Sequence, residues 1–165
     1  MKNPTRHKLR GAEYFLSMMQ QAFEDDNKFI FNLSAFLSAS RSITWHMQKQ
    51  YRHVNGFNEW YGRQETRMSQ DIELKYLNDA RVEDVHNNPV RVGASREVAV
   101  SLDVILGPPW AEQAKGAEPE PQAQINVKTV RRFFPQFRNV DVMEFCDNQL
   151  AKLTKLVEEC EQQFS

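Results

Sequence analysis

Arg81 and His86 are the two side chains of this 165-residue sequence whose types and spacing could do chemistry. An Asn-Asn-Pro sequence follows at 87–89, and because a proline disfavours helical geometry in the preceding residue, a helix should end near His86. A guanidinium keeps its charge and fits a phosphate, whereas an imidazole titrates near neutral pH. The pair could therefore cleave RNA without a metal ion. His86 would transfer the proton of a 2′-hydroxyl or of the leaving oxygen, and Arg81 would hold the phosphate.

The same two residues also have a purely structural interpretation. At about 100° per residue, Arg81 falls within an apolar stripe of the helix, formed by Leu74, Leu77 and Val85. Its guanidinium would then reach past the stripe to a carboxylate or to a buried helix end, and His86 would pair with Glu83 at the helix C-terminus. The residues alone leave both interpretations open.

The spacing of Arg81 and His86 resembles the mark of the HEPN domains (higher eukaryotes and prokaryotes nucleotide-binding), an arginine and a histidine a few residues apart at the end of a bundle helix. The likeness extends to a long helix containing 32–42, a helix containing 57–61 and a final long helix, and so covers most of the chain except residues 90–135. It implies a mostly α fold, a HEPN-like antiparallel bundle of about five helices forming one domain over 1–165. It also implies a metal-independent endoribonuclease with Arg81 and His86 as its catalytic residues.

A full acid–base cycle needs more than one Arg–His pair supplies. A second copy from a symmetric partner would complete it, so we expect a homodimer. The resemblance further implies a toxin or defence effector acting on single-stranded RNA, with an antitoxin or a nucleotidyltransferase-like protein as partner. The alternative is a catalytically inactive dimeric bundle that binds a nucleotide, RNA or a protein. Val82 favours this alternative, because the nucleases of the family usually carry a polar residue after the arginine.

Basic residues outnumber acidic ones between positions 41 and 67 and are interspersed with aromatic residues, a composition that suits an unstacked single strand of RNA. An ordinary solvated face, with long side chains covering apolar surface, is the alternative. The candidate RNA-binding residues are Arg41, Lys49, Arg52, Trp60, Arg63 and Arg67.

Composition and charge limit the class of protein. Twenty-one Lys and Arg residues against 22 Asp and Glu residues give a net charge of −1, so no overall field recruits nucleic acid or an anionic membrane, and any RNA contact must be local. No apolar run reaches the roughly 20 residues of a membrane span, and no signal-peptide core follows the N-terminus. We therefore expect a cytoplasmic protein with no membrane partner.

The sequence offers no evident metal or cofactor site. Cys146 and Cys160 fall on one helical stripe about 21 Å apart, too far to form a disulfide within that helix, and should be small buried hydrophobes. Zinc-site motifs and glycine-rich phosphate loops are missing. We therefore expect no metal and no cofactor.

Apolar residues at spacings of three and four predict helices over 11–23, 27–51, 57–68, 71–86 and 141–164. Asp71 or Ser69 is a candidate N-cap of the fourth helix, and Asp141 and Glu144 form a candidate capping box. The second helix has an apolar stripe and, opposite it, a face of small residues that either admits a close neighbour or is solvated. That face consists of Ser34, Ala35, Ser38 and Ser42, flanked by Phe31 and Trp45.

Residues 96–106 and 125–134 alternate between apolar and polar side chains, which predicts two strands of a hairpin inserted at about 96–135. A Gly- and Pro-containing polar loop lies between them at 116–121. An isolated hairpin is marginal in water, so this one should pack on the bundle or on a partner.

Overall fold

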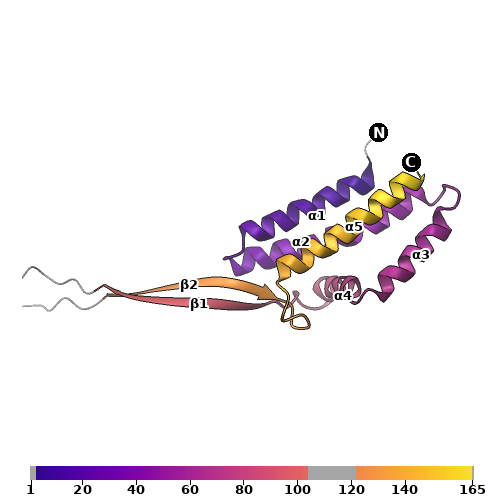
Figure 1. The fold of residues 1–165 in the computed structure, drawn as a ribbon. Coiled ribbons are helices and arrows are strands. Elements are labelled where there is room, and N and C mark those ends of the chain that lie inside the picture. The colour runs from indigo at the N-terminus through magenta and orange to yellow at the C-terminus, as the bar shows by residue number, and fades with distance from the viewer. Residues whose placement is uncertain (1–2, 104–121, 165) are drawn as a thin grey trace, which may run out of the picture.

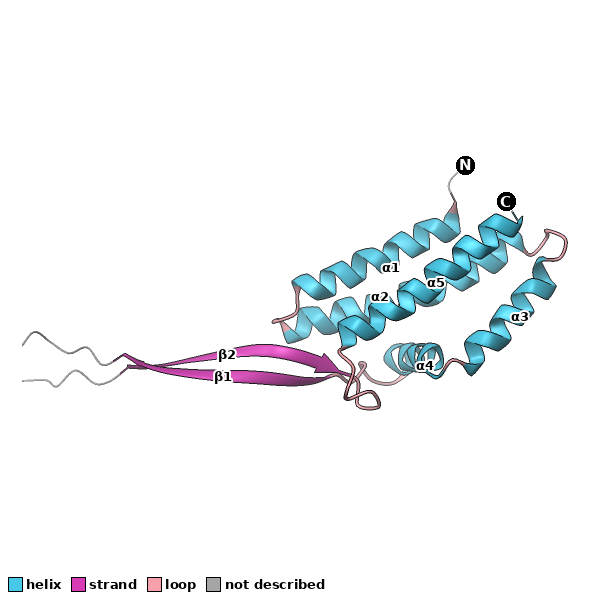
Figure 2. Cartoon of the chain, viewed as in Figure 1, coloured by secondary structure: helices cyan, strands magenta, loops and turns pink. Residues whose placement is uncertain are grey.

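The computed structural model describes residues 3–103 and 122–164, which form five helices and a two-stranded antiparallel hairpin (Figures 1 and 2). The elements in chain order are α1 (Pro4–Gln21), α2 (Asp26–Tyr51), α3 (Phe57–Gln70), α4 (Ile72–His86), β1 (Gly93–Asp103), β2 (Gln122–Phe133) and α5 (Val142–Phe164). The prediction of a mostly helical fold with a hairpin before the last helix is confirmed. The loop predicted at 116–121 and the strand residues predicted beyond 103 lie outside the described residues.

The sequence pattern predicts that the first helix begins at residue 11, but in the structure it begins at Pro4. Asn3 is its N-cap, and the Asn3 side-chain oxygen accepts a hydrogen bond of 3.0 Å from the amide of Arg6. Pro4 occupies the first helical turn, where its missing N–H costs nothing. The Asn-Pro pair is the signal that apolar periodicity overlooked.

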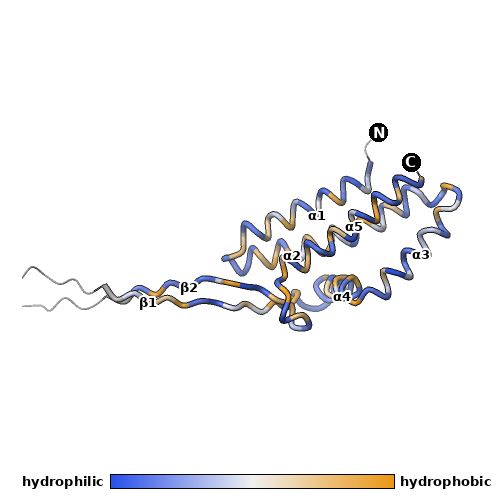
Figure 3. The backbone as a smooth tube through the Cα atoms, viewed as in Figure 1, coloured by the Kyte–Doolittle hydropathy of each residue, from blue (hydrophilic) through white to orange (hydrophobic). Residues whose placement is uncertain are grey.

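Helices α1, α2 and α5 lie side by side and enclose the core (Figure 1). Hydrophobic and hydrophilic residues interleave along the helices (Figure 3), and α1, α2 and α5 each bury one apolar face in this core. The predicted stripe of α2 is fully confirmed as buried, and it consists of Phe29, Leu33, Phe36, Ile43, Met47 and Tyr51. Burying each such side chain contributes about 1.5–3 kcal/mol.

An ion pair joins α1 to α5 at the end of the bundle where both termini lie (Figure 1). Arg6 Nη2 of α1 lies 2.6 Å from Glu161 Oε2 of α5, and Arg6 Nε also donates to this carboxylate. None of the helices in the described ranges is long and apolar enough to cross a bilayer.

Helices α3 and α4 cover one side of the three-helix layer, with α4 running across it (Figure 1). Gly56 permits the turn into α3 with a φ of 80°, a left-handed geometry that favours glycine. Asp71, and not the alternative Ser69, caps α4, because the Asp71 carboxylate accepts hydrogen bonds from the amides of Glu73 and Leu74. The same carboxylate binds Lys152 of α5 at 2.7 Å, so α4 is fixed to the core helix.

The hairpin projects away from the bundle, and only its root contacts the helices (Figure 2). Val98 pairs with Val127 and Val100 with Ile125, and these four side chains are 57–65% exposed on one face of the sheet. The expectation that the hairpin packs on the bundle therefore holds only for its root. There the amide of Thr129 donates to Glu24 at 2.8 Å, and the amide of Arg132 donates to Asp141.

Gly93 begins the hairpin opposite Phe133, the last residue of β2. A Cβ at this position would lie 2.5 Å from Cε2 of the Phe133 ring, so a larger residue would force that ring to move.

The N-cap of α5 differs from the predicted capping box. The Asp141 carboxylate accepts a hydrogen bond from the amide of Met143, whereas the capping box requires one from the amide of Glu144.

Candidate functional site

The Arg–His pair lies at the C-terminal end of α4, which stops at His86 as predicted. The amides of Asn87 and Asn88 both donate to the carbonyl of Glu83 and close the helix. The Glu83 carboxylate accepts from the side-chain amides of Asn87 and Asn88, at 2.8 and 3.4 Å. These hydrogen bonds, that from Asn87 first, lower the pKa of Glu83. The asparagines therefore occupy the carboxylate that was expected to pair with His86.

His86 is exposed, and its imidazole forms no hydrogen bond or ion pair within the described ranges. The structural interpretation of this residue, a partner for Glu83, is thus wrong.

Arg81 is half-buried, and its Nε is a fully buried donor without an acceptor among the described residues. The nearby carboxylates are engaged elsewhere. Asp84 accepts from the Ser34 hydroxyl of α2 and from the amide of Val90, while Asp79 lies 3.7 Å from Lys75. The expectation that Arg81 reaches a carboxylate is therefore not met within the described ranges. A buried N–H left without an acceptor costs about 1–3 kcal/mol.

The apolar stripe predicted around Arg81 is only partly buried. Leu77 is 6% exposed and Leu74 is half-buried, but Val85 is 49% exposed. The neighbouring Val82 is 42% exposed. The end of α4 therefore presents apolar side chains to solvent beside the two candidate catalytic residues.

Five of the six candidate RNA-binding residues are exposed, on α2, on α3 and at the turn between them: Arg41, Lys49, Arg52, Arg63 and Arg67. Trp60 is the exception and is 6% exposed. Its ring packs against Phe57 and Phe164, with centroids 5.9 and 5.5 Å away, so it is not available to stack on a base. Trp45 is the exposed aromatic side chain beside these cations: it is 52% exposed, and Lys49 Nζ lies 5.2 Å from the centre of its ring.

The spacing of the aromatic residues in α3 already indicates that Trp60 is buried. Phe57, Trp60, Tyr61 and Gln64 recur at intervals of three and four, and all four are buried. That periodicity marks a core-facing side, whereas Arg63 falls away from it and Arg67 lies at its edge, and both are exposed.

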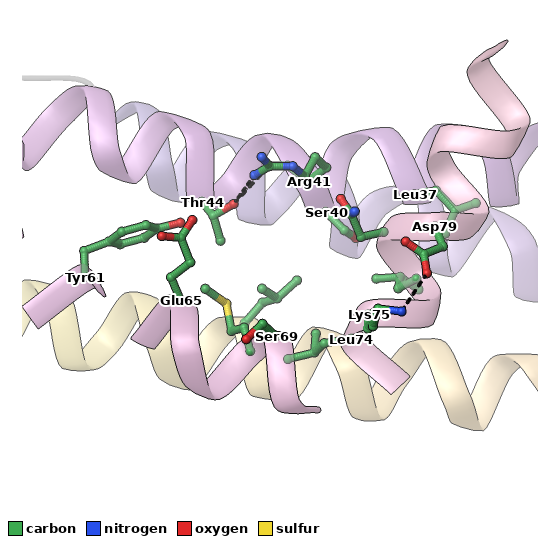
Figure 4. Close-up of a pocket in the computed structure, with 14 residues that line it drawn as sticks. Leu37, Ser40, Arg41, Thr44, Tyr61, Glu65, Ser69, Leu74, Lys75 and Asp79 are labelled. Carbon is green, nitrogen blue, oxygen red and sulfur yellow. Dashed lines mark hydrogen bonds and ion pairs between the residues drawn. The ribbon is translucent and has the colours of Figure 1, made fainter. Parts of the chain in front are cut away.

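A pocket with a volume of about 310 Å³ lies between α2, α3 and α4 (Figure 4). Arg41 is the one predicted RNA-binding residue that lines it, and its Nη1 donates to the Thr44 hydroxyl at 2.8 Å. Arg81 and His86 do not line this pocket. Sequence reasoning missed it, because its wall depends on how three successive helices pack on one another and on Leu153 of α5.

Within the described ranges, no three histidine, cysteine or acidic side chains gather in a way that could hold a metal ion. Cys146 and Cys160 are both buried free thiols, in agreement with their predicted placement.

Comparison with known proteins gives one result. The family model described as bacteriophage lambda protein ea47 matches residues 4–92, which is more than half of the 165-residue chain. This chain belongs to the bacteriophage lambda ea47 family. The ea47 match spans α1 to α4, and so includes Arg81, His86 and most of the pocket wall, but it ends before the hairpin. No significant match is found among curated proteins or among solved structures.

Proposed function

We propose that this ea47-family protein is a HEPN-like, metal-independent endoribonuclease that acts on single-stranded RNA as a homodimer. In the proposed reaction, one His86 removes the proton of a 2′-hydroxyl, whose oxygen attacks the adjacent phosphorus. The other His86 of the dimer protonates the leaving 5′-oxygen, and Arg81 holds the phosphate. The products carry a 2′,3′-cyclic phosphate and a 5′-hydroxyl. The biological role that follows from the HEPN resemblance is a toxin or defence effector, restrained by an antitoxin or a nucleotidyltransferase-like partner.

The unpartnered Nε of Arg81 is the observation that carries this proposal. A half-buried guanidinium with no carboxylate to neutralise it favours an anionic ligand, and a phosphate fits its planar fork. His86 lies on the same helix, five positions further on, exposed and free of other partners within the described ranges. These two features support the roles proposed for Arg81 and His86.

The apolar residues at the end of α4 support the homodimer. Val82 is 42% exposed and Val85 is 49% exposed, and two copies of α4 packed about a two-fold axis would cover them. Such a contact would bring two Arg–His pairs to one interface. The exposed cations Arg41, Arg63 and Arg67 lie on neighbouring elements and supply local positive charge for the rest of the RNA strand.

Purified protein should cut single-stranded RNA in the presence of EDTA, leaving 2′,3′-cyclic phosphate ends. His86→Ala should lower the rate by about 100-fold or more, because proton transfer is lost. His53→Ala is the matched control, since His53 is also exposed but lies outside α4. If the wild type and His86→Ala leave the RNA equally intact, the nuclease proposal fails.

The dimer is tested separately. Val85→Glu places a charge on a side chain that is already 49% exposed, so the monomer should still fold. It should sediment as a monomer and lose cleavage together with dimerisation. A wild-type protein that is monomeric at the concentrations at which it cuts RNA would contradict the composite site.

A non-catalytic binding module is the second candidate, and the exposed Val82 beside Arg81 favours it. In that case the apolar end of α4 binds another protein, or the dimer holds a nucleotide or RNA without cutting it. Retention of intact RNA by the wild type, weakened by Arg81→Lys and unaffected by His86→Ala, would identify this function.

A further inference from the structure

The pocket between α2, α3 and α4 contains a hydroxyl that nothing in the fold explains. Ser40 of α2 lines the pocket and is 2% exposed, and its Oγ forms no hydrogen bond (Figure 4). The hydroxyls of Ser42, Thr66 and Thr154 instead donate to carbonyls one turn earlier in their own helices, at 2.8–3.0 Å. Ser40 thus lacks the partner that a helical hydroxyl ordinarily finds, and a buried polar group without a partner is costly.

The surroundings of Ser40 are apolar. Leu37 of α2, Leu77 of α4 and Leu153 of α5 line the pocket and are each at most 6% exposed. Met68 and Leu74 complete this lining. The volume of about 310 Å³ is at the small end of the range for ligand pockets, roughly 300–1,000 Å³. The pocket therefore suits a small, mainly apolar molecule that offers one polar atom to Ser40.

The charged side chains of the lining cancel one another. Arg41 and Lys75 contribute two positive charges, and Glu65 and Asp79 contribute two negative charges (Figure 4). Lys75 and Asp79 already face each other, with Nζ 3.7 Å from Oδ2. Because the net formal charge is zero, neither an anion nor a cation gains from entering, which favours a neutral ligand over a phosphate or an amine.

We propose that this pocket binds a neutral, mainly apolar small molecule of one or two rings, held by one hydrogen bond to the Ser40 hydroxyl. The site is separate from Arg81 and His86, which do not line it, so the proposal is independent of RNA cleavage. A serine hydroxyl can donate or accept, so the ligand group can be an N–H or a ring nitrogen.

Matched pairs of probe molecules test this hydrogen bond. Indole and indene have nearly the same shape, but only indole has an N–H; quinoline and naphthalene differ in the same way by a ring nitrogen. Each probe is titrated into the full-length protein and followed by NMR chemical shifts. We expect the polar member of at least one pair to bind about 3- to 10-fold more tightly than its hydrocarbon, the worth of one hydrogen bond. Indole-3-carboxylate and tryptamine should bind more weakly than indole.

Ser40→Ala should remove the preference for the polar probe and bring the ratio within each pair close to one. The variant should be at least as stable as the wild type without ligand, because it deletes an unpartnered hydroxyl. Ser42→Ala is the matched control, since Ser42 already donates to Ser38 and does not line the pocket. The proposal is overturned if no probe binds, if charged probes bind best, or if Ser40→Ala leaves the ratios unchanged.

Discussion

Arg132, at the root of the hairpin, forms an ion pair with Asp26, in the first turn of α2, with Nη2 2.7 Å from Oδ1. The arginine is 2% exposed although its carboxylate partner is largely in solvent. Arg132 also donates from Nε and Nη2 to the carbonyl of Phe23, at 3.0 and 2.7 Å, and its guanidinium lies 4.4 Å from the centre of the Phe29 ring. One side chain thus joins the hairpin to the turn between α1 and α2.

Arg132→Met should lower the free energy of unfolding by about 2–3 kcal/mol. The substitution removes the hydrogen bonds that the buried guanidinium donates, and it leaves the Phe23 carbonyl unpaired. Urea denaturation followed by circular dichroism measures this loss. Arg96→Met is the control, since Arg96 pairs with the same Asp26 but is 43% exposed, and should cost no more than about 1 kcal/mol. Equal losses in the two variants would contradict the anchoring role of Arg132.

The pair between Arg6 and Glu161 should make stability depend on pH. Hydrogen bonding to Arg6 holds the pKa of Glu161 below its ordinary value of 4.5, against a smaller opposing effect of burial. A carboxyl with a lowered folded pKa stabilises the protein above its unfolded pKa and loses this contribution as pH falls through the folded one. The stability difference between wild type and Glu161→Gln should therefore be constant near neutral pH and shrink below about pH 4.5.

Glu144→Gln on the same helix is the control for this experiment, because Glu144 is exposed and makes no ion pair in the described ranges. Its profile should run parallel to that of the wild type. A difference for Glu161→Gln that stays unchanged down to low pH would show that the carboxylate does not depend on Arg6.

Both cysteines should be inert toward thiol reagents in the folded protein. Burial raises the pKa of Cys160 to about 12 and that of Cys146 further above its ordinary value, so little of the reactive thiolate exists at neutral pH. Ellman's reagent should label neither thiol in the native protein and both in concentrated guanidinium. Rapid labelling of the native protein would contradict the burial of Cys146 and Cys160 in the core.

The exposed face of the hairpin should contribute little to the stability of the bundle. Val100→Thr combined with Ile125→Thr alters a cross-strand pair whose side chains are 60% and 65% exposed, so the free energy of unfolding should change by no more than about 0.5 kcal/mol. Denaturation at several protein concentrations measures it. A larger loss that grows with protein concentration would show that another copy of the chain covers this face.

The fold could be predicted where one strong period dominates the sequence. The stripe of α2 and the seam of α5, with Cys146, Leu150, Leu153, Val157 and Cys160 buried, follow directly from spacings of three and four. The hairpin followed from alternation, but β1 begins at Gly93, before the alternation does. Its first residues are held by pairing with 131–133, a contact between distant parts of the chain that no local pattern encodes.

The candidate site was harder to predict, because it depends on which partners each side chain finds. The sequence located Arg81 and His86 at a helix end but could not show that Glu83 binds Asn87 or that Asp84 binds Ser34. The small face of α2 gave a similar ambiguity. Ser34 contacts α4 through Asp84, while Phe31 and Trp45 remain exposed, so the face is packed in one part and solvated in others.

The pairing of Gly93 with Phe133 means that the chain leaves the helical body and returns to it at neighbouring points. Paired residues in an antiparallel sheet lie only about 5 Å apart, so the connection between α4 and α5 is fixed at the root of the hairpin, whatever the length of chain beyond it. Insertions and deletions near the far end can therefore alter the reach of the hairpin without displacing a helix. An engineered graft at this place can therefore lengthen or shorten the strands while the helices keep their positions.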